Sequence, residues 1–275
     1  MKKFPPSPRA PRGANVLLLF AAALTLCGCA TVPVTGRKQM VLISSTQMAS
    51  LGADSYSQKM AASRLSANAE QTAMVKRVGA RVSQAVEQYL KEQGQSSAIR
   101  GFAWEFNLIE DPVVNAWCMP GGKVAFNTGI LPVCQNEAGI AVVMGHEIAH
   151  VVANHGGERM SQQLLAQMGG MGLAAALQQQ PEATQQLALA AFGAGTQLGA
   201  ILPYSRLHEF EADRLGMIFM AMAGYDPAEA PKFWERMQAL GGGSASPQFL
   251  STHPSGASRI RELRELLPEA VRYYK

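Results

Sequence analysis

The chain has 275 residues, of which 48% are hydrophobic, and it carries 24 Lys and Arg against 20 Asp and Glu. This length fits one large domain or two small ones, and the apolar content is sufficient for a substantial core. Because four of the basic residues lie among the first 28, the rest of the chain is about neutral, and it has no block of Lys and Arg interleaved with aromatics that would indicate nucleic-acid binding.

The first 28 residues have the layout of a secretory signal peptide. Basic side chains precede an apolar run at residues 16–26, which is short for a membrane-spanning helix of about 20 apolar residues. The run ends in Leu-Cys-Gly-Cys, which resembles a bacterial lipobox. This resemblance implies cleavage before Cys29 and a lipid on its thiol, which anchors the chain to a membrane without crossing it. Since Ala30 rather than Asp follows, the resemblance further implies the outer membrane, facing the periplasm.

Residues 29–44 contain Pro and Gly with little periodicity, and we expect them to be a lipid-anchored tether. The tether would lead into a single folded domain at residues 45–275. Within this domain, apolar side chains recur every three to four positions at residues 45–64 and 67–92. That period predicts two amphipathic helices.

Residues 99–127 change to aromatic and β-branched residues in near alternation, interrupted by Asp-Pro and Pro-Gly-Gly. This pattern predicts a small antiparallel sheet. We expect residues 115–122 to form an edge strand, which a substrate chain can join through main-chain hydrogen bonds. Cys118 in this segment and Cys134 beyond it can form a disulfide or remain separate buried thiols.

From residue 137 onward the periodicity is helical almost throughout. Helices are expected at 137–154, 158–178, 182–200, 204–223, 227–240 and 256–266. The fold class is therefore α+β, with helices dominant. The stretch 168–202 is rich in Ala, Gly, Leu and Gln, and its glutamines argue against a membrane span. We expect instead a close-packed helical pair with small-residue faces, or a mobile segment near the active site.

The strongest chemical signal is the HExxH sequence formed by His146, Glu147 and His150 within an apolar helical stretch. Positions four apart lie about 40° from each other around a helix and about 6 Å apart along it, so both imidazoles can reach one tetrahedral zinc ion. Glu147 points past the metal, where it can act as a general base toward water. These three side chains need polar partners in a buried helix, and a metal supplies them.

A catalytic zinc ion usually has three protein ligands, so a third ligand must lie elsewhere in the chain. His155 is one residue off the position of the longer HExxH motif and faces away around the helix, so we interpret it as a surface or supporting residue. Glu209 is the favoured ligand, and Asp213, one turn later, can accept a hydrogen bond from a zinc-bound imidazole. The competing choices for the ligand are Glu211 and His208.

Several separated segments together resemble the HExxH zinc peptidases grouped with the CAAX prenyl protease, the bacterial HtpX heat-shock protease and periplasmic quality-control peptidases. The segments are TGRKQMVLIS, NAWCMPGGKVAFNTGIL, NEAGIAVVMGHEIAHVVANHGGERMS, LPYSRLHEFEADRLG, GYDPAEAPKFWERM and THPSGASRIREL. Within this group the chain resembles the soluble or lipid-anchored periplasmic branch. The resemblance implies a mostly helical zincin-type (gluzincin) metallopeptidase domain with a small sheet beside the HExxH helix.

The resemblance also implies roles for individual residues. In that family the first Glu of the EFxAD pattern is the zinc ligand, which carries over to Glu209, and its Asp carries over to Asp213. His253, in Thr-His-Pro, corresponds to a loop histidine near the metal, which either stabilises the oxyanion or caps the zinc as a reversible fourth ligand. The alternative is a helix-entry turn fixed by Pro254.

These features predict a zinc-dependent metalloendopeptidase, with one zinc per chain, that hydrolyses misfolded or misassembled envelope proteins. Water activated by Glu147 would attack the scissile carbonyl without a covalent intermediate. The competing hypothesis is a zinc-stabilised lipoprotein that acts as a chaperone or assembly factor with a capped site. Glu147 discriminates between them, because a scaffold that only holds metal has no need of a base.

Overall fold

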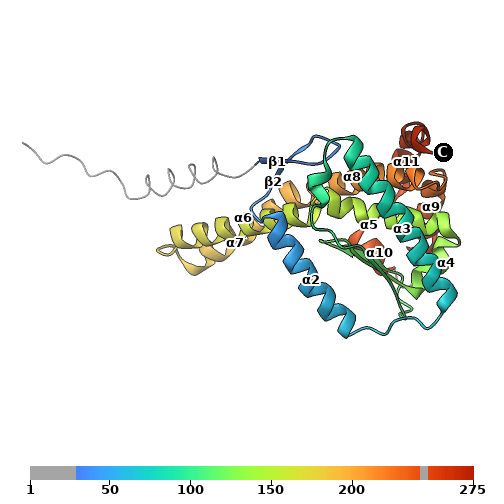
Figure 1. Cartoon of the computed structure of the whole chain (residues 1–275). Coiled ribbons are helices and arrows are strands. Elements are labelled where there is room, and N and C mark those ends of the chain that lie inside the picture. Colours follow the sequence, from blue (N-terminus) through green and yellow to red (C-terminus); the bar gives the residue numbers. More distant parts are fainter. Residues whose placement is uncertain (1–28, 242–246) are drawn as a thin grey trace, which may run out of the picture.

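The computed structural model describes residues 29–241 and 247–275, and the expected signal peptide at residues 1–28 lies outside them. Helices dominate the described residues and surround a small sheet, so the expected α+β class is confirmed (Figure 1). Most long helices begin and end within a few residues of the positions that the sequence predicts. The differences lie in the first described segment and in the strand pairing.

The segment expected to be a tether instead begins with a β hairpin that packs on the body of the protein. Strands β1 (Cys29–Thr31) and β2 (Lys38–Met40) pair antiparallel. Between them the side chain of Val32 is fully buried, and Arg37 forms ion pairs with two buried glutamates. Burial and charge pairing therefore hold this segment to the domain, which a free tether would not show.

Helices α2 (Ser45–Ala61) and α3 (Ala69–Glu92) follow the hairpin. Ser44 begins α2 through a capping box with Gln47, and the side chain of Asn68 accepts a main-chain hydrogen bond at the start of α3. The helices therefore begin where the sequence supplies capping side chains. The buried face of α3 includes Val75, Val78, Val82, Val86 and Leu90.

The sheet beside the central helices has the order β3-β5-β4, with β3 at Glu105–Ile109, β4 at Ala116–Met119 and β5 at Lys123–Asn127. Strand β5 runs parallel to β3 and antiparallel to β4, so the sheet is mixed rather than purely antiparallel. The turn between β4 and β5 contains Gly121 and Gly122, whose φ values are 94° and 84°. This turn returns β5 between the other two strands and leaves β4 at the edge, in contact with α5.

Helices α5 (Glu137–Val152) and α8 (Leu202–Met222) pack along each other at the centre of the molecule (Figure 1). They cross closely at Gly145 and Gly216. A Cβ atom on Gly216 would lie 2.8 Å from the main-chain nitrogen of His146, which is too close for any side chain to fit without a shift. The two glycines therefore set the separation of the helices that carry the candidate site.

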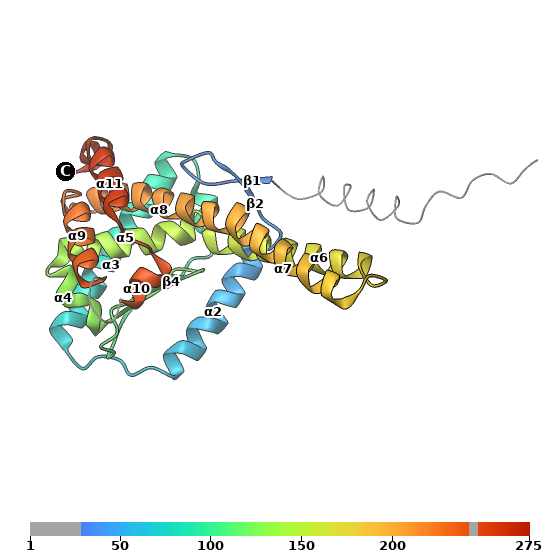
Figure 2. The same cartoon turned by 180° about the vertical axis from the view of Figure 1, so that it is seen from behind.

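Helices α6 (His155–Ala176) and α7 (Glu182–Thr196) form a hairpin that projects from the body, as Figures 1 and 2 show from opposite sides. Phe192 packs against Gly169 between them, which confirms the expected close-packed helical pair. A π-helical turn at Gln197–Ile201 joins the hairpin to α8. Within residues 29–241 and 247–275, no helix is both long and apolar enough to cross a bilayer. The exposed apolar side chains of this region include Leu164, Met168, Met171, Leu187 and Leu198.

The C-terminal part consists of α9 (Glu229–Gly241), α10 (Gln248–Thr252) and α11 (Ala257–Ala270). Helix α9 contacts α5, and α11 contacts both α8 and α9, so these elements close one end of the central helix pair. The sequence did not predict the short elements, which are α4 at Leu131–Cys134, α10, and the 3-10 turns at Ser96–Ile99, Thr128–Ile130 and Val271–Tyr273.

Cys118 and Cys134 are separate free thiols, which is the second of the two alternatives considered for them. Cys118 lies on β4, where burial raises its pKa well above the ordinary value. Cys134 is the last residue of α4, and burial raises the pKa of its thiol as well. Both thiols therefore stay protonated at neutral pH, Cys134 in the buried core and Cys118 at a half-buried position.

Candidate metal centre

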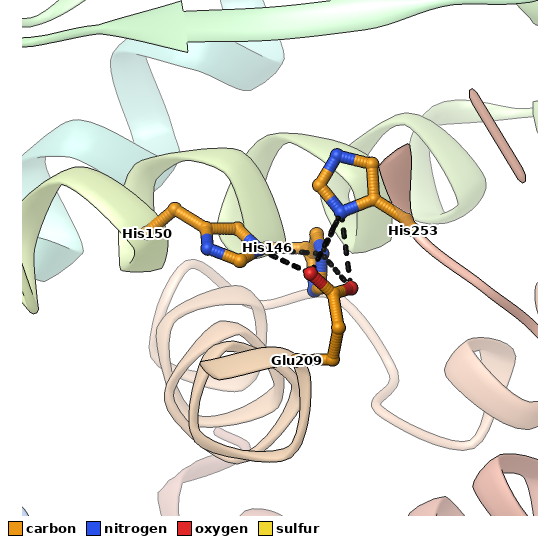
Figure 3. Close-up of side chains that lie close together, drawn as sticks. All are labelled: His146, His150, Glu209 and His253. Carbon is orange, nitrogen blue, oxygen red and sulfur yellow. Dashed lines mark hydrogen bonds and ion pairs between the residues drawn. The ribbon is translucent and has the colours of Figure 1, made fainter. Parts of the chain in front are cut away.

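Four side chains from three parts of the chain converge at the centre of the molecule (Figure 3). His146 and His150 are one turn apart on α5, Glu209 projects from α8, and His253 follows α10. One potential ligand atom of each residue lies within 4.8 Å of those of the others. The structure therefore brings together the three side chains expected to bind a metal and adds His253 to them.

The spacing of these atoms fits a tetrahedral zinc site. His146 Nε2 lies 3.0 Å from His150 Nε2, 3.1 Å from His253 Nδ1 and 3.3 Å from Glu209 Oε2. Glu209 Oε1 lies 3.4 Å from His150 Nε2, and Glu209 Oε2 lies 3.0 Å from His253 Nδ1. Ligands about 2.0–2.2 Å from a tetrahedral zinc ion are about 3.3–3.6 Å apart. The four residues therefore fit one zinc ion after only small outward movements.

The imidazole of His146 is fixed from behind by a carboxylate. Its Nδ1 lies 2.9 Å from Asp213 Oδ1, as the sequence led us to expect for one of the two histidines. Asp213 accepts hydrogen bonds of 2.7 and 2.8 Å from Arg259 Nε and Nη2, and Arg259 Nη1 lies 3.1 Å from Glu209 Oε2. Arg259 also stacks 3.5 Å above the ring of Trp234. The sequence analysis assigned no role to Arg259 or to Trp234.

The electrostatics of the centre favour a bound cation. Burial lowers the pKa of His146, but Asp213 and Glu209 outweigh burial and raise that pKa to about 9. Burial raises the pKa of Glu209, yet His150 and His253 bring it well below the ordinary value, so this carboxylate is ionised. Burial lowers the pKa of His150 well below its ordinary value, which leaves the neutral form that binds metals. The ionised Glu209 and the neutral His150 are donors of the kind a zinc site uses, and zinc would displace the proton that the carboxylates hold on His146.

Glu147 is buried next to the donor atoms and does not join them. Its Oε1 has no hydrogen-bond partner, and His253 Nε2 lies 3.3 Å from it. Burial raises the pKa of the Glu147 carboxyl, and His253 and His146 partly offset that rise. An incompletely satisfied buried carboxylate beside a metal site has the capacity to accept a proton from water.

The other candidate residues lie behind His150 and do not face the donor atoms. His155 is 1% exposed, and its Nδ1 lies 2.8 Å from His150 Nδ1, so it supports a ligand and is not a surface residue. Glu211 contacts His155, with Oε2 3.0 Å from Nε2. His208 contacts Glu158, with Nε2 2.9 Å from Oε2. Both competing choices for the third ligand are therefore engaged elsewhere.

The edge strand lies directly beside this centre. Strand β4 contacts α5, the helix that carries both HExxH histidines. Just before the strand, the carbonyl oxygen of Val114 accepts a hydrogen bond from the main-chain nitrogen of Phe249 in α10. The side chains of Asn115 and Gln248 form a second bond of 3.1 Å between the same two segments. Helix α10 and the following His253 are therefore tied to the strand next to the metal centre.

Comparison with known proteins finds a matching protein family and several similar proteins. The profile of Peptidase family M48 matches residues 76–267, a range that contains all four donor residues. Mitochondrial metalloendopeptidase OMA1 of Schizosaccharomyces pombe is 39% identical over 186 residues, which cover 67% of this chain and 53% of that protein. OMA1 of Arabidopsis thaliana is 35% identical over 193 residues, covering 67% of this chain and 36% of that protein.

A bacterial relative is similar over a smaller share of the chain. The Beta-barrel assembly-enhancing protease of Escherichia coli is 32% identical over 166 residues, which cover 58% of this chain and 34% of that protein. The chain therefore spans about half the length, or less, of these relatives.

Proposed function

This chain belongs to peptidase family M48, and from that premise we propose that it is a zinc-dependent metalloendopeptidase. Zinc would be held by His146, His150 and Glu209, with Glu147 as the general base. The observation that carries the proposal is the convergence of these donors from α5 and α8 at tetrahedral spacing, with a buried carboxylate beside them. Membership of a zinc peptidase family supports zinc as the metal.

The residues of the centre have separate roles in the proposed hydrolysis of a peptide bond. Bound zinc supplies a Lewis acid that polarises the scissile carbonyl and acidifies water. Glu147 accepts a proton from the attacking water and delivers it to the leaving amine. Its raised pKa suits a group that must both take up and release a proton near neutral pH. Asp213 and Arg259 hold His146 with its Nε2 toward the metal.

His253 serves in this proposal as a reversible cap on the metal. Its Nδ1 belongs to the donor set, and its Nε2 lies 3.3 Å from Glu147 Oε1, so the ring lies between Glu147 and the other donor residues. An attacking water and a substrate carbonyl need that space. Replacement of His253 by alanine is therefore expected to raise peptide cleavage while zinc is retained. A fall in cleavage would assign His253 to stabilisation of the oxyanion instead.

The proposed substrates are unfolded or misassembled envelope proteins. Strand β4 is an edge strand beside α5, and an extended chain can pair with such an edge through its main chain whatever its side chains. That mode of binding favours chains that have lost or not yet reached their fold. The name of the E. coli relative, a Beta-barrel assembly-enhancing protease, supports a substrate in the bacterial envelope.

The proposed location is the outer membrane, through a lipid on Cys29, with the domain facing the periplasm. The sequence around Cys29 supports the lipid anchor. In the fold, β2 contacts α6, and the main-chain nitrogen of Leu42 donates a 2.9 Å hydrogen bond to Ser161 Oγ. The anchor would therefore lie near the base of the α6–α7 hairpin, whose exposed apolar side chains suit a position close to lipid.

A second candidate function is a zinc-stabilised lipoprotein that assists folding or assembly and keeps its site capped. The presence of His253 among the donor atoms favours this alternative, since a permanent fourth ligand would exclude water. The two functions differ in whether Glu147 is needed.

The test compares zinc content and casein cleavage in wild type and in Glu147→Gln. We expect the variant to retain zinc and to lose cleavage by about 10²–10⁴-fold, the usual contribution of a general base. Glu70→Gln, on the exposed first turn of α3, is the control for loss of a carboxylate and should cleave like wild type. Unchanged cleavage in Glu147→Gln would remove the base assignment. An inactive wild type that remains inactive after His253→Ala would favour the scaffold.

A further inference from the structure

A cluster of polar side chains behind His150 takes no part in the mechanism above. The cluster contains four side chains that are almost inaccessible to solvent. His155, Glu158 and His208 are each 1% exposed, and Glu211 is 4% exposed. Buried charges of this kind are costly unless they are paired and hydrogen-bonded. The presence of these four buried polar side chains on one side of the metal centre therefore indicates that they have a role there.

The cluster forms an unbroken chain of contacts from the N-terminal hairpin to a candidate zinc ligand. His150 Nδ1 lies 2.8 Å from His155 Nδ1, and His155 Nε2 lies 3.0 Å from Glu211 Oε2. Arg37 donates to that same oxygen from Nε at 3.1 Å and from Nη2 at 3.0 Å. The hydroxyl of Thr35 donates to the other oxygen of Glu211.

Only one set of proton positions is consistent with these contacts and with a metal on His150 Nε2. Arg37 and Thr35 donate hydrogen bonds to Glu211, and an ionised carboxylate can only accept. Glu211 therefore also accepts from His155, whose proton must lie on Nε2. His155 Nδ1 is consequently an acceptor, and His150 Nδ1 must donate to it. That leaves the lone pair of His150 Nε2 free to face the other donor atoms, as ligation requires.

The other HExxH histidine has the same type of support in a shorter form. His146 Nδ1 contacts Asp213, and Asp213 is held by two nitrogens of Arg259. Each imidazole is thus backed by a carboxylate that an arginine fixes. For His150 the additional ring of His155 spans the longer distance to Glu211.

The geometry requires an arginine at position 37 rather than a simple positive charge. Besides Glu211, Arg37 binds Glu158 through two parallel bonds, Nη1 to Oε1 at 2.9 Å and Nη2 to Oε2 at 2.7 Å. Glu158 in turn contacts His208, whose ring stacks on His155 with centroids 4.2 Å apart. One guanidinium therefore orients two carboxylates that hold His155 in place, which the single ammonium of lysine cannot reproduce.

On the basis of the proposed zinc peptidase function, we propose that Arg37 is a positioning residue for the metal: through Glu211 and His155 it fixes the tautomer and orientation of His150. Arg37 lies in the hairpin between β1 and β2, far in sequence from the helices that carry the ligands. The hairpin that directly follows Cys29 therefore completes the metal centre, and it does so without contacting substrate.

The test measures zinc affinity by chelator competition in the full chain, with the visible spectrum of the Co²⁺-substituted protein as a second readout. Arg37→Ala and Glu211→Gln are expected to weaken zinc binding by about 10- to 100-fold and to alter the Co²⁺ spectrum. Arg37→Lys should recover folding stability more fully than zinc affinity, because it restores charge without the paired bonds.

The matched control is Arg236→Ala. Arg236 has a side chain 23% exposed and pairs with Glu229, much as Arg37, 16% exposed, pairs with Glu158, but its partners lie away from the donor residues. This variant should lose stability in urea unfolding and keep the zinc affinity and Co²⁺ spectrum of wild type. Equal weakening of zinc binding in both arginine variants, or unchanged binding in Arg37→Ala, would overturn the proposal.

Loss of zinc binding must be distinguished from a failure to fold and from a lack of peptide cleavage. If Arg37→Ala does not fold, Glu211→Gln and Thr35→Val test the same contacts with smaller changes of side-chain volume. Zinc affinity is measured without substrate, so it does not depend on whether the wild type cleaves peptides. An inactive wild type whose zinc binding depends on Arg37 would sustain this inference and refute the peptidase function.

Discussion

Replacement of Gly216 by alanine is expected to weaken the metal centre from a position outside it. The new Cβ would lie 2.8 Å from the main-chain nitrogen of His146 and 3.0 Å from its Cα, whereas ordinary contacts are about 3.5–4.0 Å. Helix α8 must then move from α5 by roughly 0.5–1 Å. Glu209 lies two turns earlier on the same face of α8, so its carboxylate moves by a similar amount relative to the imidazoles.

This displacement is large compared with what a metal site tolerates. Metal–ligand distances vary by only about 0.2 Å, so we expect weaker zinc binding, together with a loss of about 1–3 kcal/mol in the free energy of unfolding of the zinc-free protein. Chelator competition and urea unfolding measure the two effects. Gly172→Ala on α6 is the control, because nothing lies within 4 Å of its added Cβ. It should gain about 0.5–1 kcal/mol and bind zinc normally. Unaltered zinc affinity and stability in Gly216→Ala would refute the role assigned to the helix crossing.

Three further predictions concern the side chain of Asp213, stabilisation by bound zinc, and the side chain of Glu269. Asp213→Asn should weaken zinc binding by about 10- to 100-fold in chelator competition, because the support of His146 Nδ1 is lost. Zinc at 100 times its dissociation constant should stabilise the protein by about 2.7 kcal/mol, measured by urea unfolding with and without metal. Hydrogen bonds from Arg214 lower the pKa of Glu269, although burial opposes them. Because a lowered carboxyl pKa contributes stability above the unfolded-state pKa, Glu269→Gln should cost about 0.5–1 kcal/mol at pH 7. The difference between variant and wild type should begin to shrink as the pH falls to about 4, the unfolded-state pKa, and should be lost as the pH passes below the lowered pKa of Glu269.

Local periodicity found the helix with the two imidazoles and favoured Glu209 as the third ligand. The choice of Glu209 over Glu211 and His208, and the attention to His253, rested also on the family resemblance. The HExxH spacing fixes two imidazoles on one helical face, and the i, i+4 spacing of Glu209 and Asp213 predicts a ligand and its support on another helix. The structure brings these four side chains together. Within one helix the geometry follows from 3.6 residues per turn, so no knowledge of the tertiary fold was needed.

Features that depend on distant partners were beyond this kind of reasoning. The parallel pairing of β3 with β5 follows from the path of the chain between strands, whereas alternation of apolar residues is the same in both directions. His155 was placed on the surface or in support of a ligand on the assumption that the HExxH helix continues through it, whereas α5 ends at Val152 and His155 begins α6. Its burial depends on Glu211 and Arg37, which are distant in the sequence. Pro and Gly near Arg37 gave that segment the appearance of a tether.

The charge balance of the centre explains why Arg37 belongs to the folded core despite that appearance. Five carboxylates are buried around the metal site, and the guanidinium groups of Arg37 and Arg259 contact four of them; the carboxylates are Glu147, Glu158, Glu209, Glu211 and Asp213. Like charges at such short range are tolerable only with compensating cations. A zinc ion supplies two positive charges on the side of Glu209 and Glu147, but it cannot neutralise Glu158 and Glu211 on the far side of His155. A cation from another segment must do so, and the hairpin after Cys29 provides it.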